Sequence, residues 1–376
     1  MKSFILLIAA LTAMHAQAGT ISLDLRTDFD STTYNDAAVT AGAGVSNYRF
    51  YIPTGRIDYK GSLDADTSFR FRGRFNRDAN VVENRDSLNT TIDYVYVMHK
   101  FSDYFGLTAG KFLGDGNGNE GPTPAGEQYH YSESFVQSTL GKYKSVALKS
   151  NTNTTTYVTG AKASYFINDT NTVNFMVLDL DADTGRGATT GSPAANAQDV
   201  NSKTAAQNKS MLGVSYQGYL LDKNFSILAS YHTQTINSDV NANYAAIGLG
   251  YTMGSVLVTA DYSANTFNSN DLGLYTPKDQ LNSAILKVVY TIDPNYSVQA
   301  KVISSQEKFD TSVAFPTGAT NNYLDYSAAI EWKPKATDIF RYHAAYVSKT
   351  ETPDAGDTRT SSEIIVGMRI LADFIK

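Results

Sequence analysis

The spacing of polar segments constrains this chain more than any other feature of its sequence. Short segments containing the turn formers Gly, Pro, Asn and Asp alternate with long polar stretches along the whole chain. Between them, apolar and polar residues alternate with the period of two that is typical of a β-strand. The short segments are residues 61–66, 101–104, 168–171, 221–224, 253–254, 293–295 and 333–337. The long segments are residues 30–44, 76–90, 113–155, 181–209, 234–242, 264–280, 307–322 and 349–361.

This pattern predicts sixteen strands, from one at residues 19–29 to a last one at residues 362–374. An even number of antiparallel strands, with tight turns at one rim and long loops at the other, closes into an up-and-down β-barrel. A closed barrel pairs every backbone polar group and has no free edge, which is what a hydrocarbon environment requires. No Pro/Ser-rich linker interrupts the chain, so we expect a single domain.

The two faces of the predicted strands indicate lipid outside and water inside. Residues 69–75 place Arg70, Arg72 and Arg74 between Phe69, Phe71, Gly73 and Phe75, so that charges stand on one face and mostly rings on the other. Other strands repeat the pattern, and the last carries Ile364, Val366, Met368, Ile370, Ala372 and Phe374 on its apolar face. The polar faces include Asp261, Lys287, Lys301, Asp325, Glu331, Arg341 and His343. A polar interior is expected of a hydrated lumen, whereas the interior of a soluble barrel is apolar.

The first eighteen residues have the features of a secretory signal peptide. Lys2 precedes a short apolar stretch, and Ala16, Gln17 and Ala18 provide small residues before a cleavage point. We therefore expect residues 1–18 to be removed and residues 19–376 to form the barrel. The chain has no cysteine, so it has neither disulfides nor a thiol nucleophile. Its net charge of −6 argues against nucleic acid as a partner.

The segment YVYVMHKFSDYFGLTAGKF at residues 94–112 resembles the hairpin that precedes the inward-folding third loop of Gram-negative outer-membrane general porins. The resemblance covers the predicted barrel as a whole. It implies a sixteen-stranded porin with short periplasmic turns, long extracellular loops and a third loop, residues 113–155, folded into the pore. It further implies a homotrimer in the outer membrane, in contact with lipid and lipopolysaccharide and requiring no cofactor. The implied function is passive diffusion of small hydrophilic solutes and ions through a water-filled channel.

Charged residues are unevenly distributed along the chain, and this distribution bears on selectivity. By strand alternation, six arginines of the first three strands point inward: Arg26, Arg49, Arg56, Arg70, Arg72 and Arg74. They form either a selective basic wall or local pairs with Asp24, Asp28 and Asp58. We favour the wall, because the arginines at 70–74 have no matching acids on their own strand.

The long segment at residues 113–155 contains Asp115, Glu120, Glu127 and Glu133 before its first basic residue, Lys142. If it enters the barrel as in the porins it resembles, an acidic loop faces the basic wall and sets up a transverse field across a constriction. The alternative is that these acids remain at the cell surface.

Several other functions remain as alternatives. A phosphate- or oxyanion-specific porin would use the arginine forks together with Lys60, Lys100 or Lys111. A barrel enzyme or an adhesin ranks below both kinds of porin, since His99, His130, His232 and His343 are scattered along the chain. Asp115, Asn117 and Asn119 have the first three spacings of a calcium-binding loop, which is a weak sign of a metal site.

Overall fold

The computed structural model describes twelve segments of the chain, and all structural statements below concern them. They are residues 17–40, 47–76, 89–116, 118–132, 138–139, 142–143, 157–179, 211–235, 240–269, 278–309, 318–335 and 339–375. The predicted signal peptide lies almost wholly outside these residues, as do Asn117 and Glu133.

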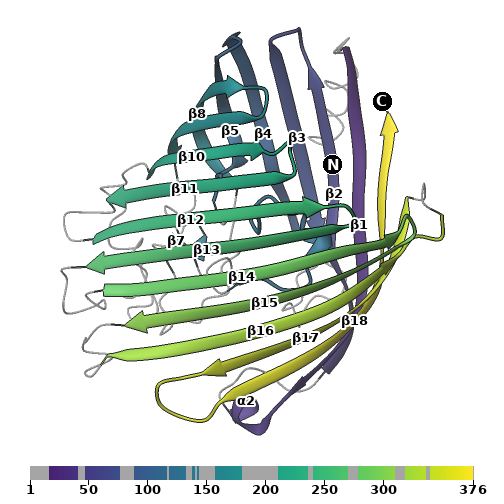
Figure 1. The fold of residues 1–376 in the computed structure, drawn as a ribbon, viewed down its shortest axis with the longest axis vertical. Coiled ribbons are helices and arrows are strands. Elements are labelled where there is room, and N and C mark those ends of the chain that lie inside the picture. Colours follow the sequence, from purple (N-terminus) through teal and green to yellow (C-terminus); the bar gives the residue numbers. More distant parts are fainter. Residues whose placement is uncertain are drawn as a thin grey trace.

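Sixteen antiparallel strands form one closed barrel in which each strand pairs with its described neighbours in the sequence (Figure 1). The barrel closes where the first strand runs beside the last. The strands are β1 (Gln17–Tyr34), β2 (Asn47–Ser62), β3 (Thr67–Asn76), β4 (Asn89–Ser102), β5 (Phe105–Leu113), β8 (Tyr157–Asn168), β9 (Asn171–Asp179), β10 (Met211–Leu220), β11 (Phe225–Thr235), β12 (Val240–Met253), β13 (Val256–Ser269), β14 (Lys278–Asp293), β15 (Tyr296–Phe309), β16 (Ala319–Trp332), β17 (Phe340–Thr352) and β18 (Arg359–Ile375). A two-stranded sheet of β6 (Ser138–Thr139) and β7 (Lys142–Tyr143) is separate from the barrel.

The predicted number of strands and six of the predicted short turns are confirmed. The seventh, at residues 333–337, falls between β16 and β17, and its last two residues lie outside the described part of the chain. Several predicted loops are too long, because their strands continue beyond the apolar alternation. The ladder between β13 and β14, for example, reaches Asn268 and Lys278 inside the segment predicted as a loop. Backbone pairing does not depend on apolar side chains, so polar residues extend the strands past the lipid-facing band. The first predicted loop also contains a short helix, α2 (Asp36–Thr40), which is capped by Asn35.

Pro53 lies at an irregular point in the β1–β2 ladder. Arg26 pairs with Thr54, but Asp28 pairs with Tyr51, so β2 contains a bulge here. Proline lacks the N–H group that a regular ladder needs, which is the reason for the irregularity.

The orientation of the strand faces is confirmed. Ile364, Val366 and Phe374 of β18 are exposed on the outer surface, whereas Arg369 of the same strand is buried inside. Tyr342 and Tyr346 of β17 likewise point outward. Among the described helices, none has the length and apolar composition needed to cross a bilayer.

One side of the barrel interior is apolar, which strand alternation did not predict. The inner cluster consists of Tyr94, Phe112, Val158, Met176, Leu178, Met211, Tyr244 and Ala246. The third-loop segment begins at Leu113, which packs against this cluster. Part of the inner wall therefore serves as a core on which the loop is anchored.

Candidate functional site

Residues 114–116 and 118–132, which follow β5 in the third loop, extend across the inside of the barrel. Near its start, Asp115 accepts hydrogen bonds from Lys162 on β8, Asn174 on β9 and Ser215 on β10. Further along, the backbone N–H and the side-chain amide of Asn119 both donate to Asp261 on β13. The predicted entry of this loop into the barrel is therefore correct.

The next residues of the loop are bound to β15. Glu120 lies 2.8 Å from Lys301 on β15 and accepts hydrogen bonds from the backbone and hydroxyl of Ser132. Lys301 also donates to the backbone carbonyl of His130. These contacts connect two points of the loop to one lysine of the wall.

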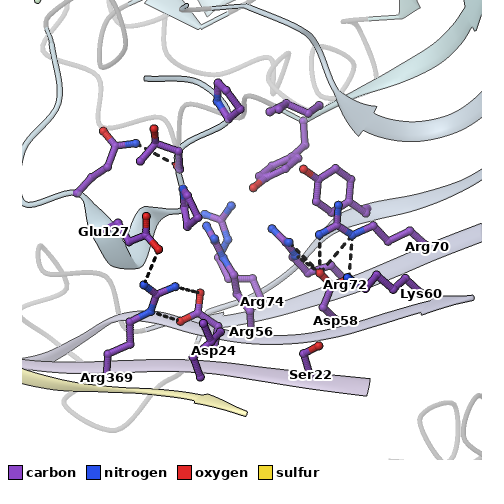
Figure 2. A pocket seen from close by; sticks show the side chains of 18 of the residues that line it. Ser22, Asp24, Arg56, Asp58, Lys60, Arg70, Arg72, Arg74, Glu127 and Arg369 are labelled. Carbon is purple, nitrogen blue, oxygen red and sulfur yellow. Dashed lines mark hydrogen bonds and ion pairs between the residues drawn. The ribbon is translucent and has the colours of Figure 1, made fainter. Parts of the chain in front are cut away.

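The loop reaches the barrel closure through residues 126–128. Arg26 of β1 donates to the Gln128 carbonyl at 2.9 Å, and Arg369 of β18 pairs with both Asp24 and Glu127 (Figure 2). A Cβ atom on Gly126 would lie 2.5 Å from Nε of Arg369, so only glycine permits this approach without displacement. Arg26 thus holds the loop in place and is almost completely buried.

Four arginines of β2 and β3 share two carboxylates. Arg70 and Arg72 both bind Asp58 of β2, and Arg56 and Arg74 both bind Asp93 of β4. As expected, β3 itself carries no matching acid, but Asp58 and Asp93 on the neighbouring strands pair with its arginines. The local pairing offered as the alternative is present for these four arginines, and it leaves two guanidinium charges in excess of the two carboxylates.

Aromatic rings fix the positions of these guanidinium groups. The Cζ atoms of Arg70 and Arg72 lie 4.2 and 4.7 Å from the centre of the Tyr94 ring, and that of Arg74 lies 5.5 Å from the centre of the Tyr157 ring. Such contacts favour a cation over the face of the ring. The carboxylates and the rings together restrict the rotamers of these long arginine side chains within the lumen.

A cavity of about 970 Å³ separates this wall from the loop. Arg56, Arg70, Arg72 and Arg74 line one side together with Lys60 and Asp58, and residues 121–124, 127, 128 and 131 line the loop side. Figure 2 shows Arg56 and Arg74 side by side, extending from the sheet toward the loop. The cluster is therefore accessible to solutes within the barrel.

The remaining predicted site residues lie elsewhere. Arg49 pairs with Asp30 and does not line this cavity. Lys60 lines it, whereas Lys100 lies over the ring of Phe166 and Lys111 is not among the residues lining it. Asp115 and Asn119 bind different walls, and Asn117 lies outside the described residues, as does Glu133. The described residues contain no group of three or more His, Asp or Glu arranged to hold a metal.

The predicted acidic face of the loop is largely neutralised. Asp115 is paired with Lys162 and Glu120 with Lys301, on walls away from the arginine cluster. Glu127 alone of the described predicted loop acids lines the arginine cavity, and its charge is shared with Arg369. The loop side of the arginine cavity therefore contributes little acidic charge.

Sequence reasoning missed three important participants, Arg369, Asp93 and Tyr94. Arg369 alternates with the apolar residues of the last strand, and closure of the barrel pairs it directly with Arg26. Pairing the first and last strands of the predicted barrel would have found it. Asp93 and Tyr94 lie next to Arg72 and Arg74 across the β3–β4 ladder. The register of this ladder shifts between Arg72 and Gly73, so strand alternation alone does not predict that these residues are neighbours.

The four histidines within the described residues stand in unrelated surroundings. His99 bonds Thr67 near a turn, His343 bonds Asp28 at 2.9 Å, and His232 is buried on β11. His130 in the loop is also buried, and desolvation together with nearby lysines lowers its pKa to about 2. Among the described residues, no hydrogen bond joins two of these histidines.

Comparison with known proteins places the chain in a family. The family model described as phosphate-selective porin O and P matches residues 21–374. The chain belongs to this family. The porin is thus an outer-membrane channel rather than an enzyme. A search of curated proteins found no match.

Solved structures similar to this porin share its fold at low sequence identity. The anion-selective porin from Comamonas acidovorans is 11% identical with a TM-score of 0.64, covering 94% of this chain and 99% of its own. The channel DcaP of Acinetobacter baumannii is 10% identical with a TM-score of 0.62, covering 94% and 97%. The trimer form of OmpT from Vibrio cholerae is 12% identical with a TM-score of 0.54, covering 95% and 100%.

Proposed function

We propose that this porin conducts small hydrophilic anions and that phosphate-like oxyanions are its preferred solutes. The observation that carries the proposal is the excess of guanidinium groups over carboxylates around an accessible cavity. Guanidinium forks bind tetrahedral and planar oxyanions through two parallel hydrogen bonds. The name of the family model agrees with this preference.

Local charge outweighs net charge in this proposal. The whole chain is acidic, but screening limits the reach of an exposed charge to about 8–10 Å at physiological salt. A permeating ion at the arginine cluster therefore senses Arg56, Arg70, Arg72 and Arg74 more strongly than acids elsewhere. The expected result is an anion preference despite the net charge of −6.

A general diffusion pore with a mild anion preference is the second candidate. The size of the cavity favours it, because a space of about 970 Å³ leaves room for water around a small ion. Asp58 and Asp93 also occupy part of the hydrogen-bonding capacity of the arginines. The two candidates differ in whether phosphate remains at the arginines long enough to obstruct other ions.

Planar bilayer recordings distinguish the two candidates. The reversal potential in a potassium chloride gradient gives the sign of selectivity, and phosphate added at low concentration reports binding by blocking chloride current. The preferred proposal expects anion selectivity and block at low phosphate concentration, whereas a general pore is hardly blocked. Cation selectivity of the wild-type channel would contradict both.

The triple variant Arg70→Ser, Arg72→Ser and Arg74→Ser tests the residues themselves. Removing three positive charges from the cavity wall is expected to shift the reversal potential toward cations and to weaken phosphate block. Arg359→Ser is the matched control, because Arg359 pairs with Glu351 and does not line the cavity. Selectivity that is unchanged in the triple variant removes these arginines from the mechanism.

Export and assembly complete the proposal. Residues 1–18 act as a cleaved signal peptide, and the mature chain beginning at Gly19 forms a homotrimer surrounded by lipid and lipopolysaccharide. The trimer is supported by similarity to the OmpT fold, which is described in a trimer form. Mass spectrometry of the exported protein tests the cleavage site, and cross-linking in outer-membrane vesicles tests the trimer.

A further inference from the structure

The two sides of the arginine cavity differ in chemical character. The strand side is predominantly cationic, because it is lined by six basic residues and three acidic ones: Arg56, Lys60, Arg70, Arg72, Arg74 and Arg369, with Asp24, Asp58 and Asp373. The described part of the loop that faces it carries one charged residue, Glu127, which Arg369 already binds. A solute between the two sides meets a net positive charge on one and a largely uncharged surface on the other.

The loop side and the inner end of the cavity offer apolar surface. Pro122 and Pro124 both line the cavity and are exposed. Leu113 and Tyr157 line the end where the loop leaves β5 and where the apolar inner cluster begins. Proline rings, a leucine side chain and a tyrosine ring pack against flat or aliphatic groups more readily than they replace the hydration shell of an inorganic ion.

The size of the cavity is consistent with a solute larger than inorganic phosphate. Its volume of about 970 Å³ lies at the upper end of the range of ligand pockets, about 300–1,000 Å³. Inorganic phosphate that is bound by the arginines leaves the proline-lined side of this space filled with water. A solute with a body attached to its anionic group reaches both sides at once.

We propose that the cavity preferentially takes organic anions with a ring or another apolar body, namely aryl phosphates and aryl carboxylates. The anionic group lies against Arg56 and Arg74, and the body packs against Pro122 and Tyr157. This inference rests on the proposed anion conduction, which it deepens by naming the class of solute. It makes the loop a binding surface as well as a constriction.

Three probes with the same anionic group test the inference in wild-type channels. Inorganic phosphate, phenyl phosphate and glycerol phosphate are added in turn while chloride current is recorded in planar bilayers. Phenyl phosphate is expected to reach half-block at a concentration about tenfold below that of inorganic phosphate, because burial of part of its ring adds to binding. Glycerol phosphate, which is larger than phosphate but polar, is expected to resemble inorganic phosphate.

The outcomes separate this inference from the function on which it rests. If phenyl phosphate and inorganic phosphate block alike in an anion-selective channel, the inference fails and the proposed function stands. If phenyl and glycerol phosphate block equally well, size alone is responsible and the apolar surface has no part. A wild-type channel without anion preference overturns the proposed function, and this inference with it.

A proline variant assigns the effect to the loop. Pro122→Ser makes the loop surface polar and is expected to reduce the advantage of phenyl phosphate about threefold while leaving block by inorganic phosphate unchanged. Pro353→Ser is the matched control, because Pro353 lies between β17 and β18 and does not line the cavity. Equal loss of block by both probes in Pro122→Ser would indicate a displaced loop. An unchanged advantage would exclude Pro122 from the proposed contact.

Discussion

The ion pair between Lys301 and Glu120 is expected to hold the third loop inside the barrel. Both side chains are nearly inaccessible to solvent, and the charged atoms lie 2.8 Å apart. The same ammonium group donates to the His130 carbonyl, and the same carboxylate accepts from Ser132. Replacing Lys301 with Met leaves a buried carboxylate and a backbone carbonyl without their shared donor.

The separation of the charges sets the size of the effect. Two unit charges 2.8 Å apart attract with about 6 kcal/mol at an effective dielectric constant of 20, before the cost of desolvation is subtracted. Removing one partner of a buried pair costs about 3–5 kcal/mol in measured cases. If this cost of about 3–5 kcal/mol destabilises only the docked state of the loop, the equilibrium ratio of docked to undocked loop decreases by about two to four orders of magnitude.

Single-channel recording reads the position of the loop directly. Lys301→Met is expected to raise the mean conductance and to produce open-channel noise as the loop leaves its place. The double variant Lys301→Met and Glu120→Gln is expected to recover much of the wild-type behaviour, because the amide carries no charge and still accepts from Ser132. Lys308→Met is the matched control, since Lys308 is exposed on the same strand.

Two results would refute this reasoning. A steady wild-type conductance in Lys301→Met would show that the pair does not hold the loop. An equal disturbance in the single and double variants would assign the effect to Lys301 alone and not to an uncompensated Glu120 charge.

Three further predictions concern the loop and the basic wall. Tyr94→Leu keeps every charge but removes the ring beneath two arginines, so the anion-to-cation permeability ratio, measured from reversal potentials, is expected to fall moderately. Gly126→Ala places a Cβ atom 2.5 Å from Nε of Arg369 and is expected to increase open-channel noise. Gly73→Ala meets no atom closer than 3.8 Å and is expected to leave the noise unchanged. The pKa of His130 is lowered to about 2 in the docked loop, whereas in an undocked loop it takes the ordinary histidine value of about 6.5. Docking is therefore strongest above a pH of about 6.5. It weakens as the pH falls below that value, by up to about 1.4 kcal/mol per pH unit, because only the undocked loop takes up the proton. His130→Asn is expected to flatten this dependence of conductance noise between pH 7.5 and 4.5, and an unchanged slope would assign it to other groups.

Much of the fold follows from local patterns in the sequence. Turn residues such as Pro294 and Gly254 mark the short connections, and period-two alternation assigns the faces of strands such as β17 and β18. The ends of the strands were harder to predict, because a ladder continues through polar residues wherever a partner strand is present. The apolar cluster around Leu178 was missed because alternation marks only which face points inward, not what covers that face.

The candidate site could be predicted only in part. The inward direction of Arg56, Arg70, Arg72 and Arg74 follows from alternation, and their common location follows from the adjacency of successive strands. Their partners do not, because the positions of Asp58 and Asp93 depend on cross-strand register and on the shift between β3 and β4. The contacts of Glu120 could not be predicted either, since a loop has no regular side-chain period from which the direction of a side chain can be inferred.

The sequence by itself determined that the chain forms a closed sixteen-stranded barrel with a wet interior and a basic stretch of wall. These properties depend on side-chain periodicity and turn chemistry, which act between residues close together in the chain. Only the tertiary structure decided which charges remain available within the barrel. Barrel closure brings Arg369 beside Arg26, and the folded loop brings Glu120 to Lys301, 181 residues away along the chain. Charge pairing depends on such distances in space, so two guanidinium charges in excess beside a cavity emerge from the fold and not from the count of arginines.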